Sequence, residues 1–303
     1  MKPYDVVVLT DSNYAYPKTI NDYVKNVLVE DALVVNALGK LGLKVVRLAW
    51  DDPNFDWSST KAILFRTTWN YFDNFHKFSK WLNKVSKLTH LINSEALIRW
   101  NIDKHYLQQL KAKGVHTAET LFIEKGDHRT LEELHLETGW TETVLKPCVS
   151  GAARHTYRLN PENRSNHQGI YEVLIAQESM MLQPLQKNII SEGEISMMVF
   201  NGQFAHAVLK KAKSGDFRVQ DDFGGSVEHY QPTNAEIEFA LQAVKSCDEQ
   251  PLYARVDIFK DNDQRIALAE LELIEPELWF RHYPEAALVL AEGIKKKLLG
   301  LSC

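Results

Sequence analysis

The stretch YARVDIFKDNDQRIALAELELIEP, residues 253–276, decides the fold of this 303-residue chain. Two runs rich in branched side chains, 253–260 and 266–274, flank a polar turn at residues 261–264. This pattern predicts a β-hairpin, because strand-forming runs separated by turn residues tend to pair with each other. Side chains alternate between the two faces of a strand, so the hairpin is expected to have one charged and one apolar face.

The charged face of this hairpin predicts a metal site. With the loop centred on the middle of the polar turn, Asp257 lies opposite Glu270 and Arg255 lies opposite Glu272. Directly opposed side chains have Cβ atoms about 4.5–5.5 Å apart, and like charges at that separation repel each other. A divalent cation would resolve this conflict, and oxygen ligands favour Mg²⁺ or Mn²⁺. A loop with an odd number of residues would shift the register and separate the acids.

An alternative interpretation of the same hairpin is a solvated polar face on an antiparallel sheet. Three features favour a site instead. Glu275 and Glu277 continue the acidic run beyond the second strand, and Arg255 adds a cation suited to binding an anion. The opposite face is small and apolar, which predicts that it packs on a core: Ala254, Val256 and Ile258 on the first strand, and Ala267, Ala269 and Leu271 on the second.

The composition limits the classes of protein to which the chain can belong. Its 45% hydrophobic and 25% charged residues are ordinary for a soluble globular enzyme. A net charge of −5 without a dense basic segment argues against nucleic acid as the main partner. Three distant cysteines argue against a disulfide framework. Neither a signal peptide nor a membrane-length apolar run is evident. We therefore expect a cytoplasmic protein without a membrane partner, and its oligomeric state stays open.

The N-terminal part, residues 1–95, is predicted to be an open α/β lobe of Rossmann-like character. Short apolar runs alternate with segments of helical periodicity, and this alternation predicts a parallel sheet. The expected strands are 6–9, 44–49 and 62–65, and the expected helices are 24–38 and 75–85.

Four residues that follow the third of these strands are predicted to contact the substrate. They are Arg66, Thr67, Trp69 and Asn70. The prediction rests on the rule that parallel sheets bind ligands beyond the carboxyl ends of their strands. The alternative is an ordinary strand-to-helix turn with a packed tryptophan.

The rest of the chain predicts smaller α+β units. Segment 161–169, PENRSNHQG, is rich in turn residues and is expected to be a solvent-facing loop without chemistry. The pair Asn201-Gly202 is a strong signal for a hairpin turn. The expected helices are 94–100, 103–113, 235–246 and 284–299, and the expected strands are 120–123, 143–146, 156–159, 195–200 and 203–210.

Several charged residues outside the hairpin are weak candidates when each is taken alone. Lys146 ends a predicted strand shortly before Ser150, where a small-residue loop begins whose amides can approach phosphates. Lys104 lies in a predicted helix, Glu194 opens a predicted strand, and Arg218 lies in a polar loop. Each of these residue types is found more often on a protein surface than in a site.

The order of these features along the chain resembles that of the ATP-grasp superfamily, whose members clasp ATP between two lobes. The resemblance covers nearly the whole chain and implies a substrate lobe at 1–95, a small ATP-grasp lobe at 96–182, and a large lobe with the metal site at 183–303. The stretches RTTWNY, GEISMMVF, GDFRVQ, YARVD and ELELIEP look most similar to the group typified by O-ureido-serine cyclo-ligase of cycloserine biosynthesis.

The resemblance implies a role for each ATP-binding candidate. The phosphates fall to two lysines and the small-residue loop, the adenine to a linker at 181–185, and the ribose to the acid that opens the next strand. The implied residues are Lys104, Lys146, Ser150, Gly151, Gln183, Leu185, Glu194 and Lys210, with Lys211 as the alternative to Lys210.

The resemblance also implies the metal ligands and the catalytic arginines. Asp257, Glu270 and Glu272 match the metal carboxylates of the family, in which the third ligand is often Asn. Arg218 matches an arginine that touches the triphosphate. Arg255 matches one that steadies the acyl phosphate and the tetrahedral intermediate.

These features predict an ATP- and Mg²⁺-dependent ligase that joins a small amino-acid-like carboxylate to an amine through an acyl phosphate. A carboxylate is too poor an electrophile for an amine, so ATP must activate it first. The sequence leaves open which substrates are used and whether both groups lie in one molecule, as in a cyclo-ligase. Two other classes stay as alternatives: a metal-dependent phosphohydrolase, and a nucleotide-binding protein without turnover.

Overall fold

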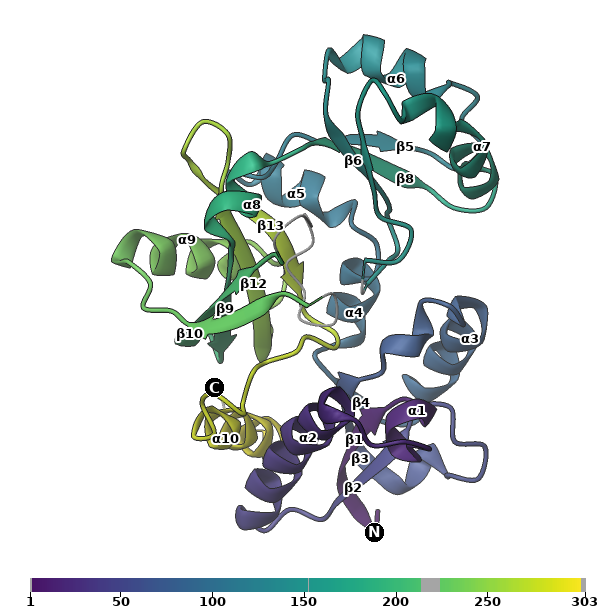
Figure 1. Cartoon of the computed structure of the whole chain (residues 1–303). Helices are drawn as coiled ribbons and strands as arrows, with labels where there is room; N and C mark the ends of the chain where they lie inside the picture. Colours follow the sequence, from purple (N-terminus) through teal and green to yellow (C-terminus); the bar gives the residue numbers. More distant parts are fainter. Residues whose placement is uncertain (1, 152, 214–223, 301–303) are drawn as a thin grey trace.

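The computed structural model describes residues 2–151, 153–213 and 224–300. It contains three separate β-sheets, each flanked by helices, and this arrangement confirms the predicted mixture of α/β and α+β lobes. Figure 1 shows the N-terminal lobe at the bottom, a small lobe at the upper right and a large lobe at the left. The division of the chain at residues 95 and 182 stays a prediction.

The N-terminal lobe is built on a parallel four-stranded sheet, as the sequence alternation predicts. Its elements are β1 Tyr4–Thr10, α1 Ser12–Ala15, α2 Asp22–Lys40, β2 Val45–Ala49, η1 Trp57–Ser59, β3 Thr60–Thr67, η2 Trp69–Tyr71, α3 Phe75–Val85 and β4 His90–Ile92, η denoting a 3₁₀ helix. The strand order is β2-β1-β3-β4, and the apolar side chains of β1 and β3 are buried. The carboxyl ends of β1 and β3 therefore lie side by side, and the residues that follow both strands lie at the same edge of the sheet.

The small lobe is an antiparallel sheet in the order β5-β8-β6-β7, with two helices beside it. Its elements are β5 Leu121–Ile123, α6 Leu131–Thr138, β6 Thr143–Pro147, β7 Tyr157–Leu159, α7 Arg164–Ile175 and β8 Met180–Pro184. Thr130 and Glu133 form a reciprocal capping box that starts α6, and Gly139 ends that helix in the left-handed conformation. Figure 1 shows α6 and α7 together at the outer end of the lobe.

The prediction for segment 161–169 is only partly right: residues 161–163 form a turn, but α7 already begins at Arg164. The first half of this helix is polar, so it has no apolar periodicity in the sequence. It is held instead by Arg164, which is 8% exposed and donates a 2.8 Å hydrogen bond to Glu132 on α6. The apolar face of α7 starts at Tyr171 and packs into the core of the small lobe.

The large lobe is an antiparallel five-stranded sheet in the order β11-β10-β9-β12-β13. Its elements are α8 Lys187–Glu192, β9 Glu194–Phe200, β10 Gln203–Lys211, β11 Ser226–His229, α9 Asn234–Lys245, β12 Tyr253–Lys260 and β13 Ile266–Glu272. The predicted turn at Asn201-Gly202 joins β9 and β10. Helix α9 packs against the apolar face of this sheet.

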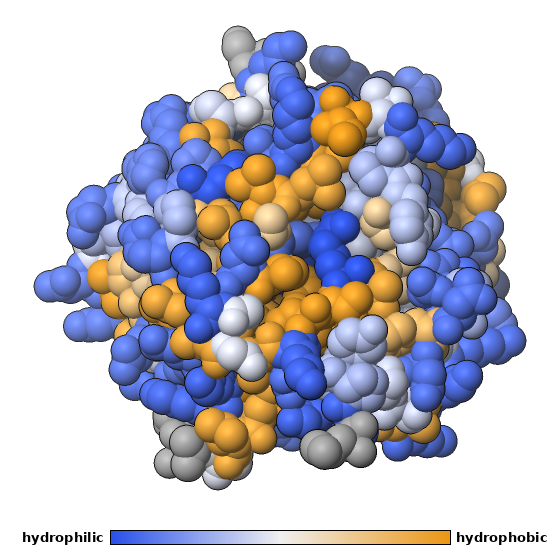
Figure 2. All heavy atoms as spheres, turned by 90° about the horizontal axis from the view of Figure 1, so that it is seen from below, coloured by the Kyte–Doolittle hydropathy of each residue, from blue (hydrophilic) through white to orange (hydrophobic). Residues whose placement is uncertain are grey.

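Three further helices join the lobes: α4 Glu95–Asn101, α5 Tyr106–Ala112 and α10 Ala286–Leu298. Residues of α2, β1 and α10 share one core with the ends of the large-lobe strands, so the N-terminal and large lobes are packed together. On the underside of the molecule, Figure 2 shows hydrophobic residues gathered between hydrophilic ones. None of the described helices combines the length and apolar character needed to span a bilayer.

The predicted pairing of charged residues across the hairpin is confirmed. Asp257 on β12 pairs with Glu270 on β13, and Arg255 pairs with Glu272. These four side chains therefore lie on one face of the sheet, at the edge formed by its last two strands.

The reason expected for this register is wrong. The turn has five residues, 261–265, because Lys260 pairs with Ile266. An odd turn shifts the register, but a β-bulge next to Asp257 shifts it back, since Ile258 pairs with Leu268. Two irregularities thus cancel, and the acids meet.

The bulge also changes the apolar face that the sequence predicts. Leu268 enters the main core of the large lobe in place of Ala267. Ala267 packs instead with Phe259 and Ala118 on the other side of the sheet. Ala269 lines the cleft described below.

Candidate active site

A cleft of about 540 Å³ opens where the three lobes meet, and it collects most of the predicted site residues. Charges of both signs line it: acids from the hairpin, and lysines from β6, from β10 and from the turn before α5. The predicted residues that line it are Trp69, Asn70, Lys104, Lys146, Ser150, Gly151, Gln183, Leu185, Glu194, Lys210, Arg255, Asp257, Glu270 and Glu272. Arg218 lies outside the described residues.

Asp257 is the most deeply held of the acids. It is 2% exposed, accepts a 2.6 Å hydrogen bond from the hydroxyl of Ser196 and forms an ion pair of 3.1 Å with Lys210. Arg255 donates to the same carboxylate from two nitrogens, at 2.9 and 3.0 Å. Burial alone would raise the pKa of Asp257, but Arg255 and Lys210 outweigh it and hold that pKa well below its ordinary value. The carboxylate is therefore ionised at neutral pH.

The other hairpin acids are under strong mutual repulsion. Burial would raise the pKa of Glu270, but Lys104, 2.9 Å away, outweighs it and lowers that pKa. Glu272 pairs with Arg255, yet burial and the neighbouring Glu270 and Asp257 raise its pKa to about 8. Burial likewise raises the pKa of Glu275 to about 7. A cation bound here would relieve this repulsion.

The two lysines that the sequence assigns to phosphate binding differ in their surroundings. Lys104 does not lie in a helix, as predicted, but in the turn between α4 and α5. Its ammonium donates a 2.6 Å hydrogen bond to the carbonyl of Ser150 and pairs with Glu270. Lys146, at the end of β6, forms no ion pair with any described residue, and burial lowers its pKa. Lys146 is thus the cation that is available to an anion in the cleft.

The small-residue loop after β6 closes against the N-terminal lobe. A Cβ atom on Gly151 would lie 2.2 Å from the ring of Phe72, so only glycine allows this close approach. Arg154 pairs with Glu178 at 2.8 Å and reaches Asp73 at 3.5 Å. The loop therefore bridges the small and N-terminal lobes at the rim of the cleft.

The predicted adenine linker at 181–185 is mostly strand, because β8 extends to Pro184. Gln183 and Leu185 still line the cleft, one within the strand and one after it. The tip of the hairpin holds the segment that follows: the Asn262 amide donates to the carbonyl of Leu185 at 3.0 Å and accepts from the Lys187 N–H at 3.0 Å. Glu194 opens β9 as predicted and pairs with Lys210 at 2.5 Å.

The carboxyl ends of β1 and β3 form the third wall of the cleft. Trp69 donates a 2.9 Å hydrogen bond to the carbonyl of Glu275, and Tyr14 meets its ring edge-on at 5.6 Å. Asn70 accepts a 2.7 Å hydrogen bond from Trp50. Asp11, which follows β1, lines the same wall, and burial raises its pKa.

Sequence reasoning missed Asp11 and Tyr14. The signal was present, because Asp11 is the second residue after the first predicted apolar strand, in the same relation that Thr67 has to the third. Parallel strands end at a common edge, so the residues after both strands were candidates of equal standing.

Arg66 and Thr67 lie elsewhere than predicted, within the core rather than on the cleft. Arg66 is 1% exposed, donates a 2.9 Å hydrogen bond to the carbonyl of Pro276 and lies 5.4 Å from the ring centre of Phe280. The Thr67 hydroxyl donates to Asp31 at 2.9 Å. The Thr67 bond lies within the N-terminal lobe, and the Arg66 bond joins that lobe to the segment after the hairpin. Neither side chain lines the cleft.

Two family descriptions match the chain in separate parts. Residues 6–93 match the N-terminal domain of D-cycloserine synthetase DcsG, and residues 158–273 match the RimK-like ATP-grasp domain. The first match covers the parallel sheet, and the second covers the acidic hairpin.

Whole-chain comparisons agree with this division. The cycloserine biosynthesis protein DcsG of Streptomyces lavendulae is 27% identical over 278 residues, which are 88% of this chain and 92% of that protein. The crystal structure of D-cycloserine synthetase DcsG superposes with a TM-score of 0.83 at 24% identity, covering 97% of this chain and 99% of that one.

More distant structures share the fold. The ATP-grasp ligase PsnB, with its minimal precursor, gives a TM-score of 0.65 at 16% identity, covering 97% of this chain and 99% of that one. D-alanine–D-alanine ligase from Bacillus anthracis gives 0.64 at 14%, covering 98% of each chain. The chain thus carries a RimK-like ATP-grasp domain and is an ADP-forming carbon–nitrogen ligase, and ATP-grasp ligases use ATP and a divalent metal.

Proposed function

We propose that this ligase activates a small amino-acid-like carboxylate as an acyl phosphate, with Mg²⁺ as its metal, and joins it to an amine. One observation carries the proposal: the bulged hairpin places Asp257, Glu270, Glu272 and Arg255 on one face, and they line the same cleft as Lys146, which forms no ion pair with the described residues. Acids for a metal and a cation for phosphate are the two halves of a phosphoryl-transfer site.

The donor set fits a hard divalent cation. Asp257, Glu270 and Glu272 offer carboxylate oxygens only, and burial together with the neighbouring carboxylates raises the pKa of Glu272 to about 8. Oxygen ligands of this kind suit Mg²⁺ and Mn²⁺, and Mg²⁺ is the usual partner of nucleotide phosphates. The metal supplies charge stabilisation to the transferring phosphoryl group. The chain's own contribution is to hold the acids in register.

Around the metal ligands, the remaining residues position ATP. Lys146 is free to pair with phosphate oxygens, and Lys104 holds Ser150 and so fixes the start of the loop above them. We assign the base to the side of the cleft lined by Gln183 and Leu185, and the ribose to Glu194. Arg218 stays a proposal from the resemblance, as a further phosphate contact.

The reaction proceeds in two balanced steps. A carboxylate oxygen of the substrate attacks the γ-phosphorus, the bond to the β,γ-bridging oxygen breaks, and ADP leaves. The amine then attacks the acyl carbon, phosphate departs with the electron pair of the acyl–oxygen bond, and the amine releases a proton. Arg255 lies beside Asp257 and Glu272 and stabilises the oxyanion between these events.

The substrate subsite lies at the N-terminal wall of the cleft. Asp11 offers a carboxylate to a substrate amino group, and Trp69 with Tyr14 offers a flat aromatic wall. A pocket of this size and chemistry suits an amino-acid-like molecule. Because a relative is named D-cycloserine synthetase, ring closure within one molecule is the form of the reaction to test first.

The experiment measures ADP release with Mg²⁺, ATP and a panel of amino acids and their O-substituted derivatives. We expect release only with a matching carboxylate, and hydroxylamine should trap the acyl phosphate as a hydroxamate. ADP release without any carboxylate would identify a phosphohydrolase instead.

The role of Lys146 is tested with a matched pair of variants. Lys146→Met should weaken binding of a non-hydrolysable ATP analogue by about tenfold or more, because a desolvated charge contact is worth about 1.5–3 kcal/mol. Lys125→Met is the control, since Lys125 is an exposed lysine of the same lobe. Equal affinity in both variants would show that Lys146 is structural.

A further inference from the structure

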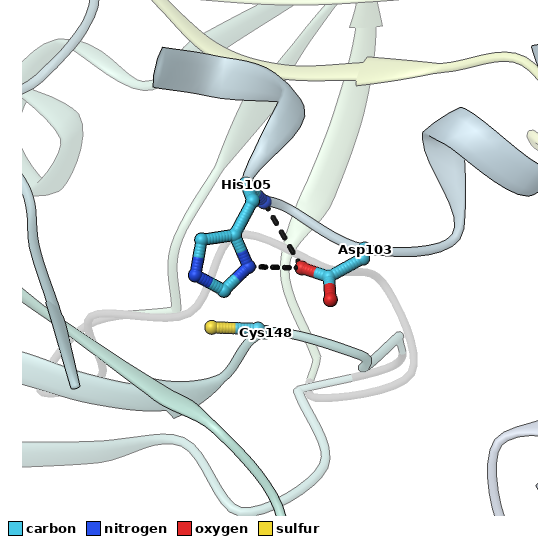
Figure 3. A group of neighbouring side chains, drawn as sticks. All are labelled: Asp103, His105 and Cys148. Carbon is cyan, nitrogen blue, oxygen red and sulfur yellow. Dashed lines mark hydrogen bonds and ion pairs between the residues drawn. The ribbon is translucent and has the colours of Figure 1, made fainter. Parts of the chain in front are cut away.

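Outside the acidic hairpin, one cluster in the described chain combines oxygen, nitrogen and sulfur ligands. Asp103, His105 and Cys148 each place one donor atom within 4.8 Å of the other two. Figure 3 shows the Asp103 carboxylate and the Cys148 sulfur beside the imidazole ring of His105. The first two residues come from the turn between α4 and α5, and the third directly follows β6.

The ring of His105 is already held as a metal ligand would be. Its Nδ1 lies 2.5 Å from Asp103 Oδ1, and its Nε2 lies 3.1 Å from a carboxylate oxygen of Glu124. The Ser179 hydroxyl donates to Glu124 at 3.1 Å, and Phe122 stacks on the ring at 4.4 Å. A carboxylate behind the second ring nitrogen is the usual companion of a metal-binding histidine, because it fixes the tautomer and the ring plane.

Cys148 supplies an independent indication of a ligand. It is 1% exposed, it is not in a disulfide, and its thiol has no hydrogen-bond partner among the described residues. A buried thiol directed at a histidine and a carboxylate provides a soft donor that ordinary packing does not require. Asp103 and His105 are more exposed, at 46% and 28% of their side chains, so the cluster is open to solvent on one side.

We propose that Asp103, His105 and Cys148 form a binding site for Zn²⁺, separate from the magnesium-binding acids of the hairpin. Zinc accepts mixed ligands of this kind at about 2.0–2.3 Å, which spaces donors in a tetrahedral site by about 3.3–3.8 Å. The Asp103–His105 contact is shorter than this, so the half-exposed carboxylate must swing outward by about 1 Å. The thiol gives up its proton on binding, and water completes the coordination.

The position of this zinc site connects it to the nucleotide cleft. Lys104 lies between two of the ligands in the sequence, and its backbone N–H donates to the Cys148 carbonyl at 2.9 Å. Zinc would therefore add a third link between the turn that carries Lys104 and the small-residue loop after β6, besides this bond and the bond from the Lys104 ammonium to the Ser150 carbonyl. The expected consequence is greater thermal stability of the protein, independent of turnover.

The test uses the full chain with saturating Mg²⁺, so that the hairpin acids are occupied. Titration with Co²⁺ should give the near-ultraviolet thiolate-to-metal absorption, and Zn²⁺ should abolish it by competition. Zinc should also raise the melting temperature. In Cys148→Ser the absorption should disappear and zinc affinity should fall by more than about 100-fold, since the loss of even an outer partner costs 10–100-fold.

Two further variants make the result specific. Glu124→Gln should weaken zinc about tenfold, because Glu124 only orients His105. Cys247→Ser is the matched control, since Cys247 is the other free cysteine of the described chain and lies outside the cluster. Zinc binding of equal strength in wild type and Cys148→Ser, or a cobalt spectrum without the thiolate band, would overturn the proposal.

Discussion

The charged face of the β12–β13 hairpin and the carboxyl end of β3 both looked functional, yet the chain uses them differently. At the hairpin, the acids face the cleft, and Glu272 and Glu275 have raised pKa values of about 8 and about 7. At the end of β3, Arg66 and Thr67 are buried and hydrogen-bonded within the protein. The first region holds several like charges close together at the cleft. The second turns its polar side chains into the protein, where Arg66 Nε has no hydrogen-bond partner among the described residues.

The difference shows that polar residues at the end of a strand indicate a functional site only when their contacts in the folded protein are known. The hairpin acids repel their own neighbours, which is an arrangement that folding alone does not favour. Arg66 instead lies against a carbonyl and an aromatic ring from a distant part of the chain. The candidate site is distinguished by like charges held together at a cleft, and Arg66 by its burial away from that cleft.

The largest expected effect is a loss of activity on substitution of a hairpin acid. Glu270→Gln removes a charge from the proposed metal site, so kcat should fall by about 100- to 1000-fold, which corresponds to several kcal/mol of lost charge stabilisation. The melting temperature should change little, because Lys104 keeps its bond to the Ser150 carbonyl. Glu238→Gln, on the exposed face of α9, is the control. Near-normal turnover in Glu270→Gln would remove the metal assignment.

The second prediction reverses the pattern at the end of β3. Arg66→Ala should lower the free energy of unfolding by about 3 kcal/mol, because it leaves a cavity and an unpaired carbonyl in the core. The KM values of the folded enzyme should not change. Urea unfolding together with steady-state kinetics of one preparation measures both. A raised KM with unchanged stability would return Arg66 to the substrate site.

A third prediction concerns the pH dependence of stability, which a buried structural histidine is expected to cause. His206 donates to the carbonyl of Leu278, and burial lowers its pKa from 6.5 to about 4. Between these values the unfolded chain binds a proton more readily than the folded one. The stability from neutral His206 is therefore complete above pH 6.5 and is lost as the pH falls towards 4. The expected loss is about 3 kcal/mol.

Urea unfolding from pH 7.5 to 4.5 measures this loss, and the nearby charged groups set the background. Glu285 opposes the pKa shift, and His282 and His229 reinforce it. His206→Gln keeps a donor for the Leu278 carbonyl but cannot titrate, so its unfolding should depend less on pH over this range. Identical pH profiles for the two proteins would rule out the role of His206.

The smallest predicted effect concerns the rim of the cleft. Gly151→Ala should weaken ATP-analogue binding about tenfold, because its new methyl group would overlap the Phe72 ring and displace the loop. Phe72→Ala makes room for that methyl group. The double variant should therefore bind more tightly than Gly151→Ala alone, and titration calorimetry of the four proteins measures the coupling. Strictly additive effects would show that the two residues do not interact.

Much of the fold and of the site could be predicted because charge and alternation are local signals. The hairpin strands, the acid pairing and the Asn201-Gly202 turn all follow from neighbouring residues. The bulge could not be predicted, since Ala267, Leu268 and Ala269 are all apolar and any of them fits either face. Helix α7 was missed because its first turns are polar and are held by an ion pair from α6.

The positions of Arg66 and Lys104 were predicted wrongly for another reason. Arg66 is bonded to Pro276, 210 residues away, and no local pattern contains that partner. Lys104 was expected in a helix because the surrounding residues favour one, but the Asp103 carboxylate accepts the His105 N–H and makes a turn. Tertiary partners and side-chain-to-backbone bonds of this kind decide such positions.

The compensated register of the hairpin has a consequence for how its length can drift among descendants of this sequence. Twelve residues separate Asp257 from Glu270, divided between a five-residue turn, two strand segments and one bulge. What must be preserved is the parity of that number, because a change of one residue sends an acid to the opposite face. As long as the bulge is kept, insertions and deletions here are expected in pairs. The acid pair is thus inherited as an even interval, and the turn between is free to vary.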